Sequence, residues 1–242
     1  ALVVERAETA KSDNRWEVLG TRLATSFSNN IRNNAGFLSR CEDRDPAARV
    51  AVLDEQGLAG CWLFPTLGMI YEEPLKHDPE AVWLMFRAFN RWLDEDWGVN
   101  YQDRIFTTPI ITLPIVEKAI EELEWAVERG AKTVLIRPAP VPCYGGSRSF
   151  AFEEFDPFWQ AVVDADVLVS MHASDSGYSR YQADWTGPQE MLPFRLDAFR
   201  TFTMGKRPIE DTAAALTCHG LLTRFPDLRI ASIENGASPR LS

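Results

Sequence analysis

Hydrophobic residues recur along this chain with two different periods, one typical of helices and one typical of strands. Over residues 78–97 they keep the spacing i, i+3, i+4, i+7 and i+11, which places them on one face of a helix. Residues 114–130 show the same helical periodicity, with a proline at the start and a glycine at the end. We therefore predict two helices with one buried face each. The buried residues are Val82, Met85, Phe86, Phe89 and Leu93 in the first helix, and Val116, Ala119, Ile120, Leu123 and Val127 in the second.

The dipeptide Asp-Pro marks three expected helix starts, at 45–46, 78–79 and 156–157. An aspartate before a helix accepts a hydrogen bond from a free backbone N–H group, and proline fits the first turn because its missing donor is not needed there. We expect each aspartate to be the N-cap of the helix that follows it.

Short apolar runs separate these helical stretches and read as strands that are buried on both faces. The alternation of strands and helices indicates an α/β fold with parallel strands and right-handed crossovers, either a doubly wound open sheet or a barrel. In both architectures the reactive groups gather at the carboxyl ends of the strands. The runs cover residues 58–64, 105–113, 133–137, 167–172 and 228–234.

Composition describes an ordinary globular chain. Its 242 residues are 45% hydrophobic and 25% charged, and no linker or low-complexity segment divides them, so we predict a single domain spanning residues 1–242. The formal net charge of −10 repels phosphate backbones and anionic membrane surfaces, so neither nucleic acid nor membrane is an expected partner. No secretory signal or long apolar span is visible, and a cytoplasmic location is expected.

Cysteine and aromatic residues add two expectations. The four cysteines lie far apart without a CxxC pair, which favours reduced thiols over a zinc knuckle or a redox motif. The eight tryptophans and 14 phenylalanines exceed what the predicted core faces hold, so some of them fit a subunit interface, although a core role suits most. We keep a homo-oligomer as an alternative to a monomer.

Common nucleotide and hydrolase motifs are absent from the sequence. There is no GxGxxG after a strand and no GxxxxGK[ST], and the segment YGGSRSF at 144–150 lacks the lysine and the spacing of a phosphate loop. A GxSxG nucleophile elbow is missing as well. Dinucleotide-binding, phosphate-loop and serine hydrolase readings are therefore set aside.

Polar residues collect at the expected carboxyl ends of the strands. Thr66 follows the first apolar run, Arg137 ends the third, His172 ends the fourth, and Glu234 with Asn235 ends the fifth. A buried imidazole at a strand end needs a metal, a carboxylate, a backbone group or a substrate as partner, so a functional role is favoured for His172. The two other histidines, His77 and His219, fit surface or packing roles.

Glu234 and Arg137 each allow more than one interpretation. A carboxylate at a strand end is costly to bury unless it is paired, coordinated or protonated, so Glu234 is either a functional group or half of an ion pair, for example with Arg137. Arg137 is suited to clamp a substrate carboxylate, and it is equally suited to neutralise Glu234 or to reach solvent.

Several segments together resemble a known family. They are DPAARVAVLDEQGLAGCWLFPTLG, AFNRWL, AIEELEWAVERGAKTVLIRPAP, FDPFWQAVVDADVLVSMHAS and HGLLTRFPDLRIASIENGA, which run from about residue 46 to residue 237. In order and spacing they are similar to the amidohydrolase-related family that includes aminocarboxymuconate semialdehyde decarboxylase.

The resemblance implies a (β/α)8 TIM barrel whose mouth holds a divalent metal, usually zinc. It implies ligands from an HxH pair on the first strand, a histidine ending the fifth and an aspartate ending the eighth. His172 falls on the fifth-strand ligand. Glu234 stands where the family has an acid/base histidine, which makes it the candidate catalytic residue for proton transfer or an additional metal ligand.

Candidate substrate-binding residues surround this site. Arg137 would orient a carboxylate, and Asn235 adjoins the catalytic candidate. The segment 174–185, expected to be a loop, carries two tyrosines and Trp185, which would close over an aromatic or unsaturated substrate.

The sequence also departs from the family pattern. It contains no HxH, and it stops eight residues after Glu234, at Ser242. We expect further segments at both ends of this sequence, with a fragment and a degenerate, metal-free relative as the alternatives. A parallel sheet interrupted after its sixth strand would expose a long edge, which favours the first explanation.

These observations lead to two functional hypotheses. The first is a metal-dependent amidohydrolase-family enzyme, a hydrolase or a decarboxylase (carboxy-lyase), which acts on a small organic substrate bearing a carboxylate. The second is a non-catalytic, metal-free barrel with a binding or assembly role, which the missing HxH favours.

Overall fold

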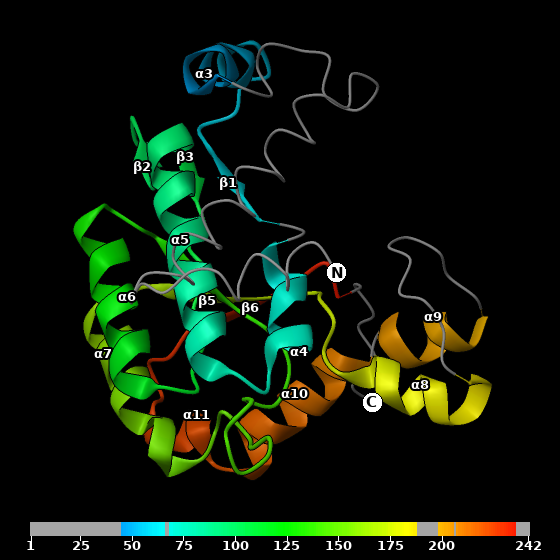
Figure 1. Cartoon of the computed structure of the whole chain (residues 1–242). Helices are drawn as coiled ribbons and strands as arrows, with labels where there is room; N and C mark the ends of the chain where they lie inside the picture. Colours follow the sequence, from blue (N-terminus) through cyan, green and yellow to red (C-terminus); the bar gives the residue numbers. More distant parts are fainter. Residues whose placement is uncertain (1–44, 66–67, 188–197, 206, 236–242) are drawn as a thin grey trace, which may run out of the picture.

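Strands and helices alternate along the part of the chain that the structure, a computed structural model, describes: residues 45–65, 68–187, 198–205 and 207–235 (Figure 1). The strands are β1 (Cys61–Leu63), β2 (Asn100–Tyr101), β3 (Ile105–Thr107), β4 (Thr133–Ile136), β5 (Leu168–His172) and β6 (Ile230–Ile233). The longer helices are α3 (Pro46–Glu55), α5 (Pro79–Trp97), α6 (Val116–Glu128), α7 (Asp156–Asp164), α8 (Tyr178–Thr186), α9 (Ala198–Gly205) and α10 (Arg207–Cys218). The shorter ones are η2 (Gly68–Tyr71), α4 (Glu72–Leu75), η3 (Glu153–Phe155) and α11 (Leu221–Arg224).

The parallel strands lie side by side in the order of the chain. β1 pairs with β3, β4 with β5, and β5 with β6, all parallel. A parallel bridge between Ile110 and Leu135 joins the two groups, with the Leu135 N–H donating to the Pro109 carbonyl at 2.8 Å and the Ile111 N–H donating to the Leu135 carbonyl at 2.9 Å. All five predicted apolar runs thus contain a strand, and the α/β class is confirmed.

One predicted strand is divided and has an unexpected neighbour. The apolar run 105–113 forms β3 and then the short bridge at Ile110, separated by Pro109, which has no N–H to donate to a ladder. β2 pairs with β3 in an antiparallel hairpin, whose turn places Gln102 and Asp103 at positive φ. The sequence analysis did not predict this hairpin.

Two of the three expected helix caps are confirmed. Asp45 accepts a hydrogen bond from the Ala47 N–H, and Asp78 accepts one from the Ala81 N–H. The third expectation is wrong, because α7 includes Asp156 in its first turn and has Phe155 at the N-cap position. The Asp156 carboxylate instead pairs with the Arg224 guanidinium, an attraction across the fold that the local pattern does not reveal.

Helices α6 and α7 cover one face of β4 and β5. Val134 and Ile136 of β4 and Val169 and Met171 of β5 belong to the same hydrophobic cluster as the buried faces of these helices. Trp159 of α7 is fully buried there and donates a hydrogen bond to the Phe150 carbonyl at 2.8 Å. Of the predicted buried face of α6, Ala119 and Leu123 are buried, whereas Val116, Ile120 and Val127 are partly buried. The predicted buried face of α5 is present, with Met85 only partly buried.

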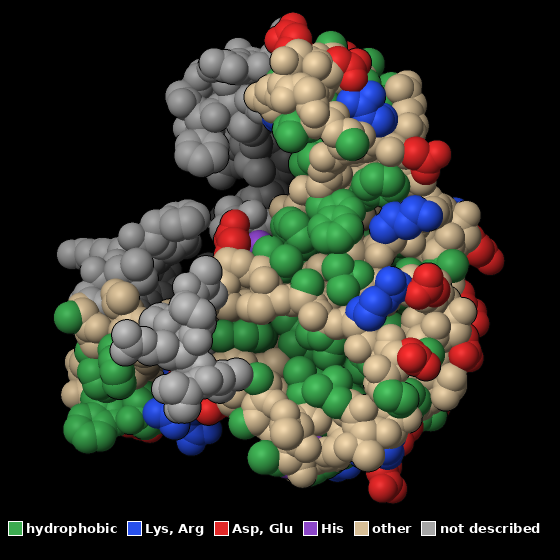
Figure 2. Space-filling view, turned by 180° about the vertical axis from the view of Figure 1, so that it is seen from behind, with side chains coloured by type: hydrophobic (Ala, Val, Ile, Leu, Met, Phe, Trp, Pro, Cys, Tyr) green, Lys and Arg blue, Asp and Glu red, His purple; other side chains and the backbone are tan. Residues whose placement is uncertain are grey.

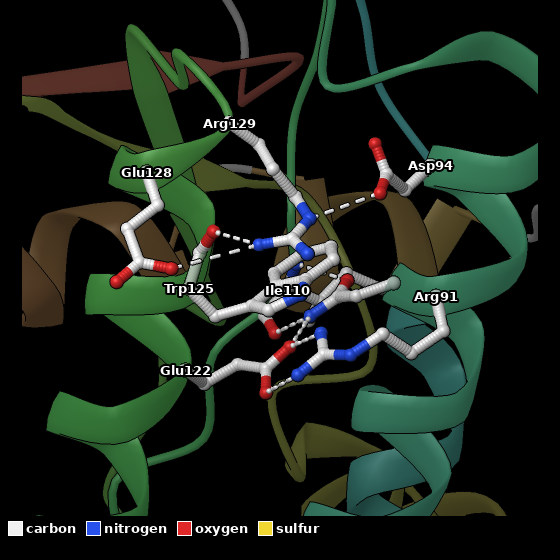
Figure 3. A network of polar contacts seen from close by, with 8 residues as sticks. Arg91, Asp94, Ile110, Glu122, Trp125, Glu128 and Arg129 are labelled. Carbon is white, nitrogen blue, oxygen red and sulfur yellow. Dashed lines mark hydrogen bonds and ion pairs between the residues drawn. The ribbon is translucent and has the colours of Figure 1, made fainter.

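Helices α5 and α6 are tied together by a polar network (Figure 3). The Arg91 guanidinium donates to both oxygens of Glu122, at 2.6 and 3.0 Å, and stacks 3.5 Å from the centre of the Trp125 ring. The Asn90 amide donates to the same carboxylate at 2.9 Å and to the Ile110 carbonyl at 2.9 Å, and it accepts from the Ile110 N–H at 2.8 Å. This network therefore fixes the bridge between the two groups of strands.

The surface keeps several large hydrophobic side chains exposed. Figure 2 shows hydrophobic side chains over the middle of one face, with charged ones toward its edge. Among the described residues, no helix is both long and apolar enough to cross a lipid bilayer. The homo-oligomer expected from the number of aromatic residues stays a prediction. The exposed side chains are Leu58, Trp62, Tyr144, Phe152, Tyr181, Trp185, Phe202 and Leu222.

Candidate functional site

Three of the predicted site residues lie at one edge of the sheet. Arg137 directly follows β4, His172 is the last residue of β5, and Glu234 directly follows β6. The strands are parallel neighbours in register, with Ile136 opposite Met171 and His172 opposite Ile233, so their carboxyl ends meet. The expectation of a shared edge is confirmed for these three residues, whereas Thr66 lies outside the described residues.

His172 presents one ring nitrogen to this edge. Its side chain is almost fully buried, and Nδ1 lies 2.7 Å from the Ala173 carbonyl oxygen, which can only accept. Nδ1 therefore carries a hydrogen, and in the neutral ring Nε2 carries the lone pair. Nε2 is buried without a hydrogen-bond partner and lies 3.6 Å from Glu234 Oε2. The ring packs against Phe64, which follows β1, with ring centres 5.5 Å apart.

Glu234 reaches His172 because of an unusual backbone conformation. Its φ of 58° lies in the left-handed region, which non-glycine residues adopt at a cost. Its side chain is 66% exposed, so the carboxylate faces both the imidazole and solvent. Such strain is often found at functional sites, where the surrounding structure holds it in place.

Asn235 holds the turn that contains Glu234. Its amide nitrogen lies within hydrogen-bonding distance of the Met171 carbonyl at 2.8 Å, the Ile233 carbonyl at 2.9 Å and the Ser232 hydroxyl at 3.2 Å. Both amide hydrogens are therefore engaged within the protein. The predicted substrate-binding role of Asn235 stays a prediction, and the structure gives this residue a role in fixing the ends of β5 and β6.

Arg137 has other partners than the sequence suggested. Its guanidinium is buried, with Nε 2.8 Å from a carboxylate oxygen of Glu72 and an NH1 hydrogen bond of 2.7 Å to Glu73. NH1 also donates to the Asp175 carbonyl at 2.9 Å. Of the alternatives open for Arg137, pairing with Glu234 and exposure to solvent are therefore wrong, and its substrate-clamping role stays a prediction.

Glu72 and Glu73 were missed by the sequence reasoning. They lie in the short helix α4, away from any predicted strand end, and adjacent acidic residues usually indicate a solvated surface. Glu72 is nevertheless buried and accepts a hydrogen bond from the Thr112 hydroxyl, and Glu73 also pairs with Lys76.

The segment after β5 differs from the predicted loop. Residues 173–177 connect β5 to α8, which begins at Tyr178 after Gly177 in a left-handed conformation. Trp185 therefore lies on a helix, where it is 69% exposed and its ring centre lies 6.4 Å from that of Tyr181 and 6.1 Å from that of Phe199. The substrate-binding role of Trp185 stays a prediction.

The remaining histidines fit structural or surface roles. His77 is exposed before α5, and His219 is exposed after α10, with Nδ1 2.8 Å from the Ser149 hydroxyl. Burial raises the pKa of the Cys61 and Cys143 thiols, which keeps them protonated and weakly nucleophilic at neutral pH. Neither thiol belongs to the strand edge described above.

Among the described residues, His172 is the side chain at the strand edge that is suited to bind a metal. His172 Nε2 has the free lone pair of a metal-binding imidazole, and its Nδ1–H donates to a backbone carbonyl, as is usual for such ligands. A catalytic zinc takes about three protein ligands, and no group of three suitable His, Cys, Asp or Glu side chains occurs among the described residues. His172 fits one ligand position, and the described residues do not complete the set.

A comparison with known families identifies the family of this chain. The chain belongs to the amidohydrolase family, whose model matches residues 42–240. The resemblance found in the sequence is thereby confirmed.

The fold is similar to those of several solved structures. An amidohydrolase from Mycobacterium avium subsp. paratuberculosis K-10 is 40% identical, with a TM-score of 0.75 over 86% of this chain and 50% of that one. At 20% identity, which shows the fold alone, the chain is similar to 2,6-dihydroxybenzoate decarboxylase from Rhizobium, with a TM-score of 0.55 over 78% of this chain and 56% of that one. It is likewise 20% identical to a dihydroxybenzoic acid decarboxylase from Polaromonas sp. JS666 with bound manganese and the inhibitor 2-nitroresorcinol, with a TM-score of 0.51 over 76% of this chain and 52% of that one.

These matches cover only part of the similar proteins. The chain spans about half the length of the solved relatives. Among curated proteins, a segment of 57 residues is 44% identical to part of a β-ketodecanoyl-[acyl-carrier-protein] synthase from Pseudomonas aeruginosa, which covers 24% of this chain and 16% of that protein. That segment is too short to carry a functional argument.

Proposed function

We propose that this protein is a metal-dependent hydrolase or carboxy-lyase that acts on a small organic substrate bearing a carboxylate. One observation carries the proposal: a buried imidazole nitrogen without a hydrogen-bond partner faces a strained carboxylate across the ends of two neighbouring parallel strands. Membership of the amidohydrolase family supports the same class of enzyme.

The proposed fold is a single (β/α)8 TIM barrel over residues 1–242. Its support is the order of the parallel strands, which follows the chain from β1 through β3 and β4 to β6. A doubly wound sheet reverses its order at a switch point, whereas a barrel keeps the order of the chain.

Glu234 is the proposed proton-transfer residue. Its partly exposed carboxylate is accessible to a substrate or a water molecule while it remains next to His172. In a hydrolysis it would accept a proton from the attacking water, and in a decarboxylation its protonated form would deliver a proton to the carbon that loses carbon dioxide. Both reactions need a proton carrier at the same position.

His172 is the proposed metal ligand. A bound divalent ion, zinc or manganese, supplies a Lewis acid that polarises a carbonyl or carboxylate group. The similar enzyme from Polaromonas holds manganese, which supports a divalent ion here. The proposed substrate contacts of Arg137, Asn235 and Trp185, and the cytoplasmic location, rest on the sequence.

Metal analysis of the purified protein tests this proposal. We expect about one equivalent of zinc or manganese per chain, consistent with a single site, and its loss in His172→Ala. The matched control is His219→Ala, which removes an exposed histidine at a different place and should retain the metal. Equal metal content in the two variants would overturn the role of His172.

The alternative is a metal-free barrel with a binding or assembly role. It is favoured by the absence of HxH from the sequence and of a three-ligand group among the described residues. Protein that remains metal-free after dialysis against zinc and manganese would support this alternative.

A further inference from the structure

The Arg137 guanidinium lies where three chain segments meet. Glu72 and Glu73 belong to α4, in the connection that follows β1, and Asp175 belongs to the connection after β5. Arg137 itself begins the connection after β4, and NH2 lies 3.4 Å from the Pro140 carbonyl in that connection. The hydrogen bonds and ion pairs of Arg137 therefore link the connections that follow β1, β4 and β5.

The charges around this guanidinium are balanced. Arg137 and Lys76 face Glu72 and Glu73, and the Thr112 hydroxyl donates to Glu72. A buried ion pair is costly to break, because the remaining charge is left without a partner in a medium of low dielectric constant. The network therefore holds its geometry firmly.

The connection after β5 contacts this network at two points. The Asp175 carbonyl, three residues after His172, accepts from Arg137, while its carboxylate accepts from the Gly177 N–H at 3.0 Å. A Cβ atom at Gly177 would lie only 3.2 Å from the Glu73 carboxylate, so α4 packs directly against this connection. The backbone that carries the Nδ1 partner of His172, the Ala173 carbonyl, is thereby held between β6 and α4.

We propose that Arg137 is a positioning residue, which holds the connection after β5 so that His172 keeps Nε2 directed at Glu234. This inference deepens the proposed function, since it rests on His172 as the proposed ligand. It also gives a role to a buried guanidinium that pairs with two protein carboxylates near the strand edge. A purely stabilising ion pair would have no specific effect on the segment that contains His172.

Three variants separate positioning from simple stabilisation. Arg137→Met removes the guanidinium, and Glu73→Gln weakens one of its partners with little change in shape. Arg91→Met is the matched control, because Arg91 also pairs with a buried glutamate, Glu122, but joins α5 to α6. Glu73→Gln keeps the test valid if Arg137→Met fails to fold.

The readouts use metal-free protein. Hydrogen exchange of the Ala173 and Gly177 amides, which donate to the Ile233 carbonyl and to Asp175, reports the position of the connection. The NMR signal of the His172 Nδ1–H reports the hydrogen bond to Ala173. In Arg137→Met and Glu73→Gln, exchange at Gly177 should be about tenfold faster, as expected when a charge-assisted hydrogen bond is lost. The ring signal should shift or broaden.

Arg91→Met should lower the melting temperature and leave both local signals unchanged. The inference is overturned if Arg91→Met changes them as much as Arg137→Met, or if neither Arg137→Met nor Glu73→Gln does. Zinc titration of the wild-type protein is a separate measurement. If zinc fails to bind while the local signals respond to Arg137→Met, the proposed metal-dependent function is wrong and the positioning role of Arg137 stands.

Discussion

The left-handed backbone of Glu234 predicts that replacing it with glycine makes the protein more stable. An L-residue in this conformation costs roughly 1–2 kcal/mol, whereas glycine adopts it without steric cost. Glycine in turn gives the unfolded chain more freedom, which costs roughly 0.5–1 kcal/mol. The carboxylate contributes little, because it is 66% exposed and an ion pair with a largely solvated partner is worth at most about 1 kcal/mol.

The free energy of unfolding of Glu234→Gly should therefore rise by about 0.5–1 kcal/mol. In a chain of this size the melting temperature should rise by about 1–4 °C. Under the proposed function, the same variant should lose catalytic activity, because it removes the proposed proton-transfer carboxylate while it relieves the backbone strain.

Calorimetry or urea denaturation of Glu234→Gly and Glu234→Ala measures this effect. The alanine variant removes the carboxylate and keeps the Cβ atom, so the difference between the two variants isolates the backbone term. Gln102→Gly is the matched control, because Gln102 is exposed and has a φ of 55° in the β2–β3 turn. If Gln102→Gly stabilises the protein while Glu234→Gly destabilises it by more than about 1 kcal/mol, the carboxylate is structural and the reasoning is refuted.

Three further predictions concern stability. Glu122→Ala should lower the free energy of unfolding, measured by urea denaturation, by about 2–3 kcal/mol. This loss is smaller than that for breaking a fully buried ion pair, because the partner Arg91 is 28% exposed. A loss below about 1 kcal/mol would contradict this prediction. Burial and then the hydrogen bond to Asp211 raise the pKa of Tyr178 from 10.0 to about 12, so its contribution is complete below pH 10 and is lost as the pH rises toward 12. The stability difference between wild type and Tyr178→Phe should therefore shrink from pH 10 to 12, and an increase would reverse the argument. Gly60→Ala should lower the melting temperature, because its Cβ would lie 2.7 Å from the carbonyl oxygen just before β3; an unchanged value would show that the strand end adjusts.

The local sequence pattern was enough to predict most of the helices and strands and which residues meet at one edge of the sheet. Apolar runs predicted all five parallel strands, and Asp-Pro pairs predicted two helix caps, because strand burial and capping depend on neighbours in the chain. Parallel strands bring their carboxyl ends to the same edge, so the meeting of His172 and Glu234 also followed from the sequence. The family resemblance followed from the order of the motifs.

Tertiary structure decided which groups those side chains meet. Arg137 pairs with Glu72 and Glu73, more than 60 residues earlier in the chain, because α4 folds over the strand ends, and no local pattern encodes that approach. The left-handed turn at Glu234 and the helix at 178–186 were likewise set by the surrounding packing. Short-range periodicity reports which face of an element is buried, whereas the partner of a buried charge depends on the positions of distant segments.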